Sequence, residues 1–267
     1  MNEQLEKLVS KVKEGSKYQN IHQQFIENIA TIEQKKGRSW KDTVKAVRNK
    51  LHQVGSAYQP QEINYDQLLS ELKSLSHDLQ SPEAKRFLIQ TMSLHTSTRE
   101  RLPILEQFYQ DALADFKALE SLLDVACGLN PLALAWMPIN QSTRIRVCDI
   151  YVDQIEFLNE FFLHFELNGK AYYCDLTQQP PQEKFQLGLI LKTIPCLEQI
   201  DKNIGKRILQ ELNCENLLVS FPAQSLTGRN KGMREFYSVH FQSLVAETQW
   251  NVTRFSYPNE QVFLLQK

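Results

Sequence analysis

The residues best suited to do chemistry in this chain lie in the segment from Asp124 to Pro131. An apolar run ends in Asp124, and small or turn-forming residues follow at alternate positions, at Ala126, Gly128 and Asn130. Gly adopts positive φ without steric cost and Asn tolerates it, so the backbone of such a turn can approach a ligand closely. The next residues, up to Trp136, are compatible with a helix. The segment therefore predicts a buried strand that passes into a helix, as in nucleotide-binding α/β folds.

A second acidic residue, Asp149, supports this interpretation. It follows the apolar segment 144–148 and lies about 20 residues beyond the turn, where a strand-end carboxylate can reach ribose hydroxyls. The alternative is an ordinary turn between a strand and a helix, with a solvated Asp. Because the G-x-G-x-x-G motif of dinucleotide binding is absent, NAD and FAD are disfavoured. The pattern is closer to the turn that holds S-adenosylmethionine, in which an acidic residue is followed by small residues and a Gly at alternate positions.

Three further charged residues are candidates for the same site. Asp175 could accept a hydrogen bond from an adenine amino group, or it could cap a helix. Lys192 ends an apolar strand, where an unpaired charge is costly to bury, so it either points outward or faces the site; we favour the second. Arg101 could pair with a methionine carboxylate through a bidentate contact, or it could be an exposed helix residue.

Strands and helices alternate from Leu122 onward, which predicts a mainly parallel sheet with helices on its faces. The expected strands are 122–126, 145–149, 171–174, 187–192, 217–221, 252–257 and 261–266, with a hairpin turn between the last two. The expected helices between them are 152–167, 196–212 and 232–247. Seven strands ending in an antiparallel pair are the sheet plan of class I (Rossmann-like) methyltransferases. Ligands of open α/β sheets bind outside the carboxyl ends of the strands, where the candidate residues converge.

The amino-terminal region is helical by its apolar spacing and basic by its charge. Apolar residues recur at helical intervals within 5–12, 21–29 and 40–51, and further helices are expected at 65–79, from residue 83, and at 104–119. Residues 1–58 carry eleven basic and six acidic side chains, a net charge of +5, whereas the remainder carries −6. A basic helical unit can dock a polyanion, although such charges can also simply solvate helix faces. We expect a helical, RNA-docking domain at 1–80 and a catalytic domain at 81–267.

Composition disfavours several other classes of protein. The chain has no apolar run of about eighteen residues that would span a membrane. Its first residues lack the charged and apolar regions of a signal peptide, so none is expected. The five cysteines are odd in number and include no C-x-x-C pair, which indicates neither a disulfide framework nor a zinc site. We therefore expect reduced thiols in a cytoplasmic protein without a metal.

The segment 220–233 is a candidate substrate loop, because it leaves the fifth expected strand and is rich in small, polar and basic residues. Arg229 and Lys231 could hold phosphates, and Phe221 or Tyr237 could stack on a base. The alternative is a generic connecting loop, although loops are where binding residues concentrate.

Taken together, these motifs resemble a known family. The chain is similar to the Arm/Rmt family of aminoglycoside-resistance 16S rRNA (guanine-N7) methyltransferases over nearly its whole length. The motifs that carry the resemblance are Ser16–Tyr18, Leu51–Tyr58, Leu94–Arg101, Asp124–Pro131, Cys148–Ile150 and Ser220–Met233. The run from Cys127 to Pro131 and the last segment are the most specific of them.

The resemblance implies methyl transfer from S-adenosylmethionine to N7 of a guanine in the decoding site of 16S rRNA, within the 30S subunit. Because N7 carries a free lone pair, no catalytic acid or base is expected, and the work is positioning. The target base has to leave its paired helix to enter the site. The product would disrupt aminoglycoside binding. We expect a monomer. The alternatives are a methyltransferase for a small metabolite and a non-catalytic rRNA-binding protein.

The resemblance also implies the residues of two sites. The cofactor-binding residues would be His95, Thr96, Ser97, Thr98, Arg101, Ala126, Cys127, Gly128, Asn130, Asp149, Asp175, Leu176, Leu191 and Lys192. The rRNA-binding residues would be Lys17, Arg48, Lys50, Phe221, Arg229 and Lys231.

Overall fold

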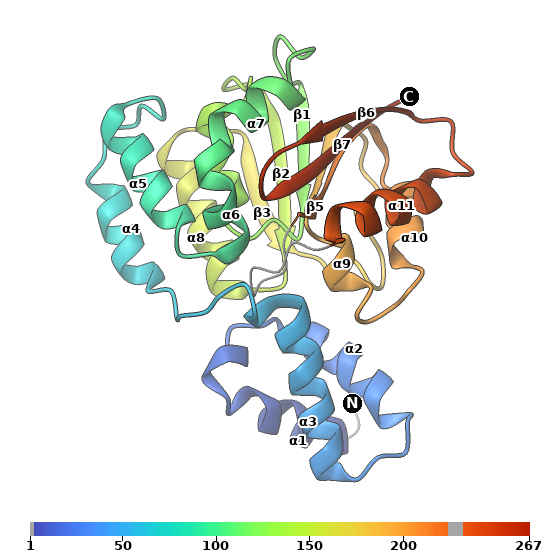
Figure 1. The fold of residues 1–267 in the computed structure, drawn as a ribbon. Helices are drawn as coiled ribbons and strands as arrows, with labels where there is room; N and C mark the ends of the chain where they lie inside the picture. Colours follow the sequence, from blue (N-terminus) through green and yellow to red (C-terminus); the bar gives the residue numbers. More distant parts are fainter. Residues whose placement is uncertain (1–2, 224–231) are drawn as a thin grey trace.

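The centre of the computed structural model, which describes residues 3–223 and 232–267, is a seven-stranded sheet. The strands are β1 (Ser121–Val125), β2 (Arg144–Asp149), β3 (Gly169–Tyr173), β4 (Phe185–Leu191), β5 (Cys214–Pro222), β6 (Asn251–Ser256) and β7 (Glu260–Gln266). Their order in the sheet is β3-β2-β1-β4-β5-β7-β6, and β7 runs antiparallel to both of its neighbours (Figure 1). The predicted fold class is confirmed, and the strand ends differ from the expected ones by at most three residues.

Apolar side chains on both faces of the strands explain why the sheet is covered by two layers of helices. In β1, Leu122 packs into one apolar core and Leu123 and Val125 pack into the other, since successive side chains point to opposite faces. The first layer contains α4 (Tyr65–Lys73), α5 (Pro82–Met92), α7 (Leu105–Ala112) and α8 (Val152–His164). The second contains α9 (Ile194–Leu197), α10 (Ile204–Glu211) and α11 (Met233–Val245), on the other side of the sheet in Figure 1.

Several connections differ from expectation for local reasons. The helix expected at 196–212 is two helices, because the Asp201 side chain accepts from the backbone N–H of Asn203 (2.9 Å) in a turn that competes with the helix. The helix from residue 65 ends at Lys73, where Ser74 bonds back to the carbonyl of Glu71 (2.6 Å). The polar cluster before the sheet forms a short helix, α6 (Thr96–Arg101), and the segment after the turn is a 3₁₀ helix, η4 (Asn130–Trp136).

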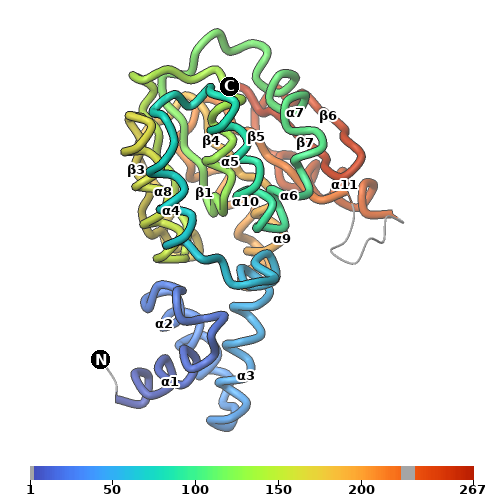
Figure 2. Tube along the Cα trace, turned by 90° about the vertical axis from the view of Figure 1, so that its left-hand side faces the viewer, coloured from blue at the N-terminus to red at the C-terminus, as the bar shows by residue number. Residues whose placement is uncertain are grey.

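The amino-terminal residues 3–58, called here the helical unit, form a separate apolar core. They contain α1 (Glu3–Lys13), the 3₁₀ turn η1 (Ser16–Tyr18), α2 (Gln23–Gln34), α3 (Trp40–Leu51) and the π-helical turn η2 (His52–Ser56). Buried apolar residues of the three helices share this core with Tyr151, which follows β2. Figure 2 shows the unit below the sheet, with α3 leading up to it. By contrast, α4 packs on α8 within the core of the sheet domain, where the rings of Tyr65 and Phe157 lie 5.2 Å apart.

Among the described residues, no helix has both the length and the apolar character needed to cross a bilayer.

Close packing around β4 yields a test of the fold. Gly188 lies in β4 between β1 and β5, and a Cβ at this position would lie 2.8 Å from both Cys214 Sγ and Leu217 Cδ2. Because overpacking a core costs about 1–3 kcal/mol, Gly188→Ala should lower the free energy of unfolding by about that amount. Thr253→Ala, on the exposed edge strand β6, is the control and should change it by about 0.5 kcal/mol or less. Equal urea-unfolding curves for both variants would contradict the packing described.

Candidate functional site

A cavity of about 850 Å³, its open mouth included, lies at the carboxyl ends of β1, β2 and β4. This is where ligands of open α/β sheets bind. Most of the residues expected to bind the cofactor line it, namely His95, Ser97, Arg101, Ala126, Cys127, Gly128, Asn130, Asp149, Leu176, Leu191 and Lys192. Segments that are distant in sequence therefore meet at one edge of the sheet.

The turn after β1 has the tight backbone that its sequence predicts. Gly128 has a φ of +52°, and a Cβ there would lie 2.9 Å from the imidazole Cε1 of His95. Ala126 also has a positive φ, +49°, which is a strained conformation for a residue with a side chain. The backbone N–H of Gly128 donates to the carboxylate of Asp149 (2.9 Å), so the turn and the end of β2 are held together.

A buried polar network extends from this turn. Asn130 donates through Nδ2 to Asp124 (2.8 Å), while its Oδ1 accepts from Arg101 Nη1 (2.8 Å) and from the Tyr109 hydroxyl (2.7 Å). Burial raises the pKa of Asp124 to about 7, even though Asn130 and Arg101 act in the opposite direction. The carboxyl beneath the turn is therefore close to its titration point at neutral pH.

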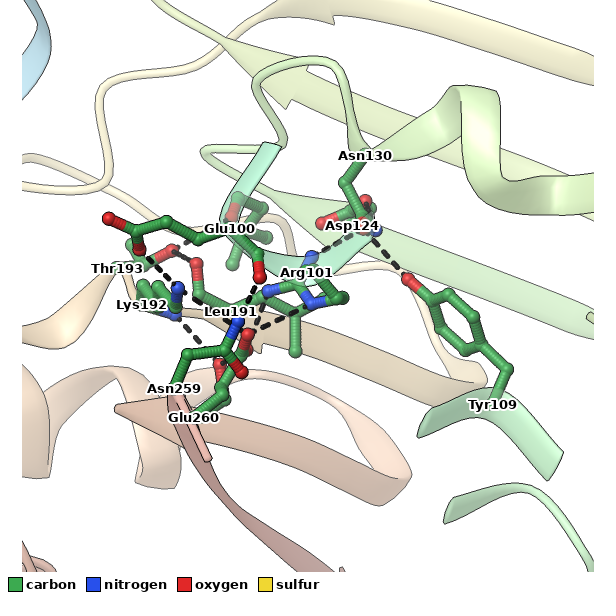
Figure 3. A network of polar contacts seen from close by, with 12 residues as sticks. Glu100, Arg101, Tyr109, Asp124, Asn130, Leu191, Lys192, Thr193, Asn259 and Glu260 are labelled. Carbon is green, nitrogen blue, oxygen red and sulfur yellow. Dashed lines mark hydrogen bonds and ion pairs between the residues drawn. The ribbon is translucent and has the colours of Figure 1, made fainter. Parts of the chain in front are cut away.

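The second part of the network is an ion cluster centred on Glu260, at the start of β7 (Figure 3). Arg101 donates two hydrogen bonds to the carboxylate of Glu260, from Nε (3.1 Å) and from Nη2 (2.6 Å). The hydroxyl of Ser220 donates a third (2.5 Å). The Nζ of Lys192 lies 2.7 Å from Glu100 and 3.5 Å from Glu260. Burial alone would raise the pKa of Glu260, but Arg101 and Lys192 outweigh it and hold the pKa below its usual value.

Two of the sequence interpretations are settled by this cluster. Lys192 faces the cavity instead of pointing outward: its side chain is 3% exposed, and it is paired with carboxylates. It also has a φ of +59°, a strained conformation at the end of β4. Arg101 does make a bidentate contact with a carboxylate, but that carboxylate belongs to Glu260. The guanidinium group of Arg101 therefore already has a carboxylate partner within the protein. The alternative, an exposed helix residue, is wrong, since Arg101 is 1% exposed.

A buried polar atom without a partner indicates that the cavity suits a polar ligand. The imidazole Nδ1 of His95 is buried and makes no hydrogen bond among the described residues, and this side chain lines the cavity. Burial lowers the pKa of His95 to about 4, with Arg101 adding to the effect, so the ring is neutral at pH 7. Because an unpaired buried polar group is costly, this nitrogen fits a ligand that carries its own donors and acceptors, such as a nucleoside joined to an amino acid.

Three of the expected cofactor residues lie beside the cavity and have structural contacts instead. The backbone N–H of Thr96 donates to the carbonyl of Tyr58 (2.8 Å). The hydroxyl of Thr98 donates to the backbone carbonyl of Met92 (2.5 Å). Asp175 accepts from the hydroxyl of Thr177 (2.6 Å) and from Asn28 of the helical unit (2.7 Å). The neighbours of Asp175 on both sides, Cys174 and Leu176, do line the cavity.

The expected rRNA-binding residues have different surroundings. Lys17 is exposed on the helical unit. Arg48 instead donates to the carbonyl of Lys11 (2.5 Å) near the end of α1, and Lys50 bonds the carbonyl of Gln199. The expectation that Phe221 stacks on a base is wrong, because its ring has no exposed surface and packs on Tyr237, Phe241 and Phe263. Arg229 and Lys231 lie outside the described residues.

Sequence reasoning missed two groups of cavity residues. One comes from the helical unit and consists of Phe25, Val54, Gly55 and Tyr58, which had been expected to serve only its core and its docking face. The motif Leu51–Tyr58 was a signal that this stretch matters. The other includes Thr193, which precedes α9, and Cys196 within it. Sequence reasoning also missed the buried Glu260, which does not line the cavity but pairs with Lys192. Glu260 had been placed in a hairpin turn, and no local pattern indicates that it pairs with Arg101.

Comparison with known proteins agrees with this geometry. The model of the family described as ribosomal RNA methyltransferase (FmrO) matches residues 14–264. The chain belongs to this family. It is similar to the 16S rRNA (guanine(1405)-N(7))-methyltransferase of Micromonospora echinospora, with 34% identity over 227 residues that cover 85% of this chain and 83% of the relative. The corresponding enzyme of Micromonospora rosea is 29% identical, in an alignment that covers 100% of this chain and 98% of the length of that enzyme.

A solved structure also covers the whole of this FmrO-family chain. The 16S rRNA methyltransferase RmtF in complex with S-adenosyl-L-homocysteine has a TM-score of 0.84 and 27% identity, over 100% of this chain and 99% of that one. The sequence-based expectation of an rRNA methyltransferase is thereby confirmed at the level of the family.

The raised pKa of Asp124 makes a testable contribution to stability. Because the folded-state pKa, about 7, lies above the ordinary value of 3.8, the folded chain binds more protons between these pH values. The stability contributed by the protonated carboxyl is therefore complete below about pH 4 and is lost as the pH rises towards 7. In Asp124→Asn, which keeps an acceptor for Asn130 and cannot titrate, this loss should be absent.

Urea unfolding of both proteins at pH 5, 6, 7 and 8 measures the effect. The free energy of unfolding of the natural chain should fall relative to that of the Asp124→Asn variant, by at most about 1.4 kcal/mol per pH unit for one proton. Parallel pH profiles of the two proteins would show that Asp124 titrates in its ordinary range.

Proposed function

We propose that this chain transfers a methyl group from S-adenosylmethionine to N7 of a guanine at the decoding site of 16S rRNA in the 30S subunit, and so confers resistance to aminoglycosides. The observation that carries the proposal is the composite cavity of an FmrO-family chain. Asp149, residues of the strained turn after β1 and His95, whose Nδ1 is buried without a partner among the described residues, all line one cavity at the carboxyl ends of the strands. The names of the two Micromonospora relatives, both 16S rRNA (guanine(1405)-N(7))-methyltransferases, supply the target atom.

The residues of the cavity divide the binding work between them. Asp149, fixed by the N–H groups of Gly128 and Ile150, would accept from the ribose hydroxyls of the cofactor. The turn 126–130, with Arg101 behind it, would hold the amino-acid end of the cofactor, and the wall beside Asp175 would hold the adenine end. When bound, the cofactor supplies an electrophilic methyl group. The chain would keep water out and bring the guanine into line, and none of its residues has to take a proton from N7.

The helical unit would dock the rRNA. Its charge of +5 suits the phosphate backbone, and folded RNA is recognised largely by shape and phosphate placement. We place this role on residues 3–58 of the expected domain 1–80, because α4 packs on the sheet domain instead. We propose that the enzyme acts as a monomer in the cytoplasm, where 30S subunits are found.

The reaction itself can be tested with labelled cofactor. Purified chain and S-[methyl-³H]adenosylmethionine should label 30S subunits and leave a metabolite extract unlabelled, and mapping should place the label at N7 of one guanine. Asp149→Ala should weaken cofactor binding by about tenfold or more, the effect of losing hydrogen bonds to a charged group. Label in the metabolites instead of the subunits would favour a small-molecule methyltransferase, and cofactor binding without transfer to either would favour a non-catalytic rRNA-binding protein.

The docking surface can be tested with two charge reversals that differ in their contacts. Lys17→Glu should weaken 30S binding and its salt dependence while leaving cofactor affinity unchanged, because the side chain is exposed. Arg48→Glu should lower the melting temperature as well, because Arg48 donates to the carbonyl of Lys11 near the end of α1. Filter binding, calorimetry and thermal unfolding give the three readouts. Unchanged 30S affinity for Lys17→Glu would remove this residue from the docking surface.

A further inference from the structure

The helical unit is joined to the segment that follows Asp149 by backbone pairing. The N–H of His22 donates to the carbonyl of Ile150 (2.8 Å), and the N–H of Val152 donates to the carbonyl of Asn20 (2.8 Å). Ile21 and Tyr151 form an antiparallel β-bridge between these two bonds. A unit that served only to carry RNA would have no need to pair with the loop that leads away from the ribose-binding carboxylate.

A second connection reaches the end of β3. Asn28 of α2 is half-buried, and its Nδ2 donates to Oδ2 of Asp175 (2.7 Å), while its Oδ1 accepts from Gln24 (3.2 Å). Because a carboxylate can only accept, the amide nitrogen of Asn28 is the end that faces Asp175. The other carboxylate oxygen of Asp175 accepts from the backbone N–H of Thr177 (2.9 Å). Asn28 and the turn after Asp175 thus hold the carboxylate from opposite sides.

This carboxylate lies beside the cavity, in a segment that forms part of the cavity wall. Asp175 is 7% exposed and lies between two residues that line the cavity, Cys174 and Leu176. One turn of helix before Asn28, Phe25 is buried and lines the same cavity from the helical unit. His22 stacks on Tyr173, the last residue of β3, with ring centroids 3.6 Å apart. The wall at the ends of β2 and β3 is therefore built jointly by the two parts of the chain.

We propose that the helical unit is part of the cofactor site, and that Asn28 is the positioning residue through which it fixes the wall around Asp175. This inference rests on the proposed function, since it takes S-adenosylmethionine as the ligand of the cavity. If Asn28 is removed, Oδ2 of Asp175 loses its donor, and the Cys174–Leu176 wall loses its attachment to α2. Cofactor affinity then depends on a residue outside the sheet domain.

A matched pair of variants distinguishes two roles for Asn28: positioning the cavity wall around Asp175, and merely attaching the helical unit to the sheet domain. Asn20 makes a chemically similar contact across the same boundary, from its Nδ2 to the carboxylate of Asp153 (2.5 Å). Asn20 is exposed, however, and only one sequence neighbour of Asp153 lines the cavity, whereas both neighbours of Asp175 do. Asn28→Ala should weaken binding of S-adenosylhomocysteine by about tenfold, the scale for one hydrogen bond to a charged group. Asn20→Ala should leave this affinity within about twofold, although it removes the same kind of bond.

Calorimetry on the full-length variants gives the dissociation constants, and steady-state kinetics with 30S subunits gives an independent readout. For Asn28→Ala, the KM for S-adenosylmethionine should rise while kcat at saturating cofactor is retained, a split that a general loss of structure would not produce. Equal affinities for Asn28→Ala and Asn20→Ala, or a fall in kcat without a change in KM, would overturn the proposal.

A second variant covers the case in which Asn28→Ala is poorly folded. Asn28→Asp keeps the shape of the side chain but places a carboxylate against Asp175, so it should weaken binding more than Asn28→Ala does. If Asn28→Asp bound S-adenosylhomocysteine as tightly as the natural chain does, the proposal would be overturned. Failure of the natural chain to bind S-adenosylhomocysteine at all would instead overturn the proposed function, so the two failures are distinguishable.

Discussion

The carboxylate of Glu260, which has no exposed surface, is the contact on which the arrangement of the site depends. It joins Arg101 of α6, Lys192 at the end of β4 and Ser220 of β5, so three separate segments meet at one buried charge. Removing such ions from water costs several kcal/mol each, and only well-oriented partners offset that cost. Each segment is therefore restricted to the conformation that supplies its partner. The strained backbone at Lys192 persists because the ion cluster fixes it there.

From Glu260 the polar contacts extend towards the other end of the cavity in two sets, which the backbone of the turn after β1 joins. Arg101 bonds Asn130, Asn130 bonds Asp124 beneath the turn, and the N–H of Gly128 in that turn bonds Asp149 at the end of β2. Hydrogen bonds in such a chain are strengthened by the low dielectric of the interior, and each member fixes the next. The cavity wall is thereby preorganised. This suits methyl transfer to a lone pair, where holding two reactants in line supplies most of what a protein can contribute.

The sequence could predict those features that neighbouring residues determine, and not those that depend on contacts between residues far apart in the chain. The central strands were found because both faces of the sheet are buried there, and the turn 124–131 was found from its small residues, of which Gly128 does adopt a positive φ. Asn130 was expected for the same reason, but it does not have a positive φ, and its side chain binds Asp124, Arg101 and Tyr109 instead. The partners of Arg101 could not be found, since Glu260 is 159 residues away and nothing in the intervening pattern encodes their contact. Phe221 was misread because a strand-end aromatic next to a polar segment looks exposed, whereas α11 and β7 bury it. Arg48 was counted as a free charge but is bonded to a backbone carbonyl.

Helix periodicity explains how the helical unit can serve both an RNA and a cofactor. His22, at the N-cap of α2, and Phe25 and Asn28 within it recur every three residues, so they lie along one side of the helix and meet the ends of β2 and β3. Three exposed basic side chains of the unit lie elsewhere: Lys17 is on η1, and Lys41 and Lys45 are on α3. The outer charges can therefore change without disturbing the inner face. A change on the inner face, in contrast, acts directly on the cavity wall, because no layer of side chains separates Phe25 from the cavity.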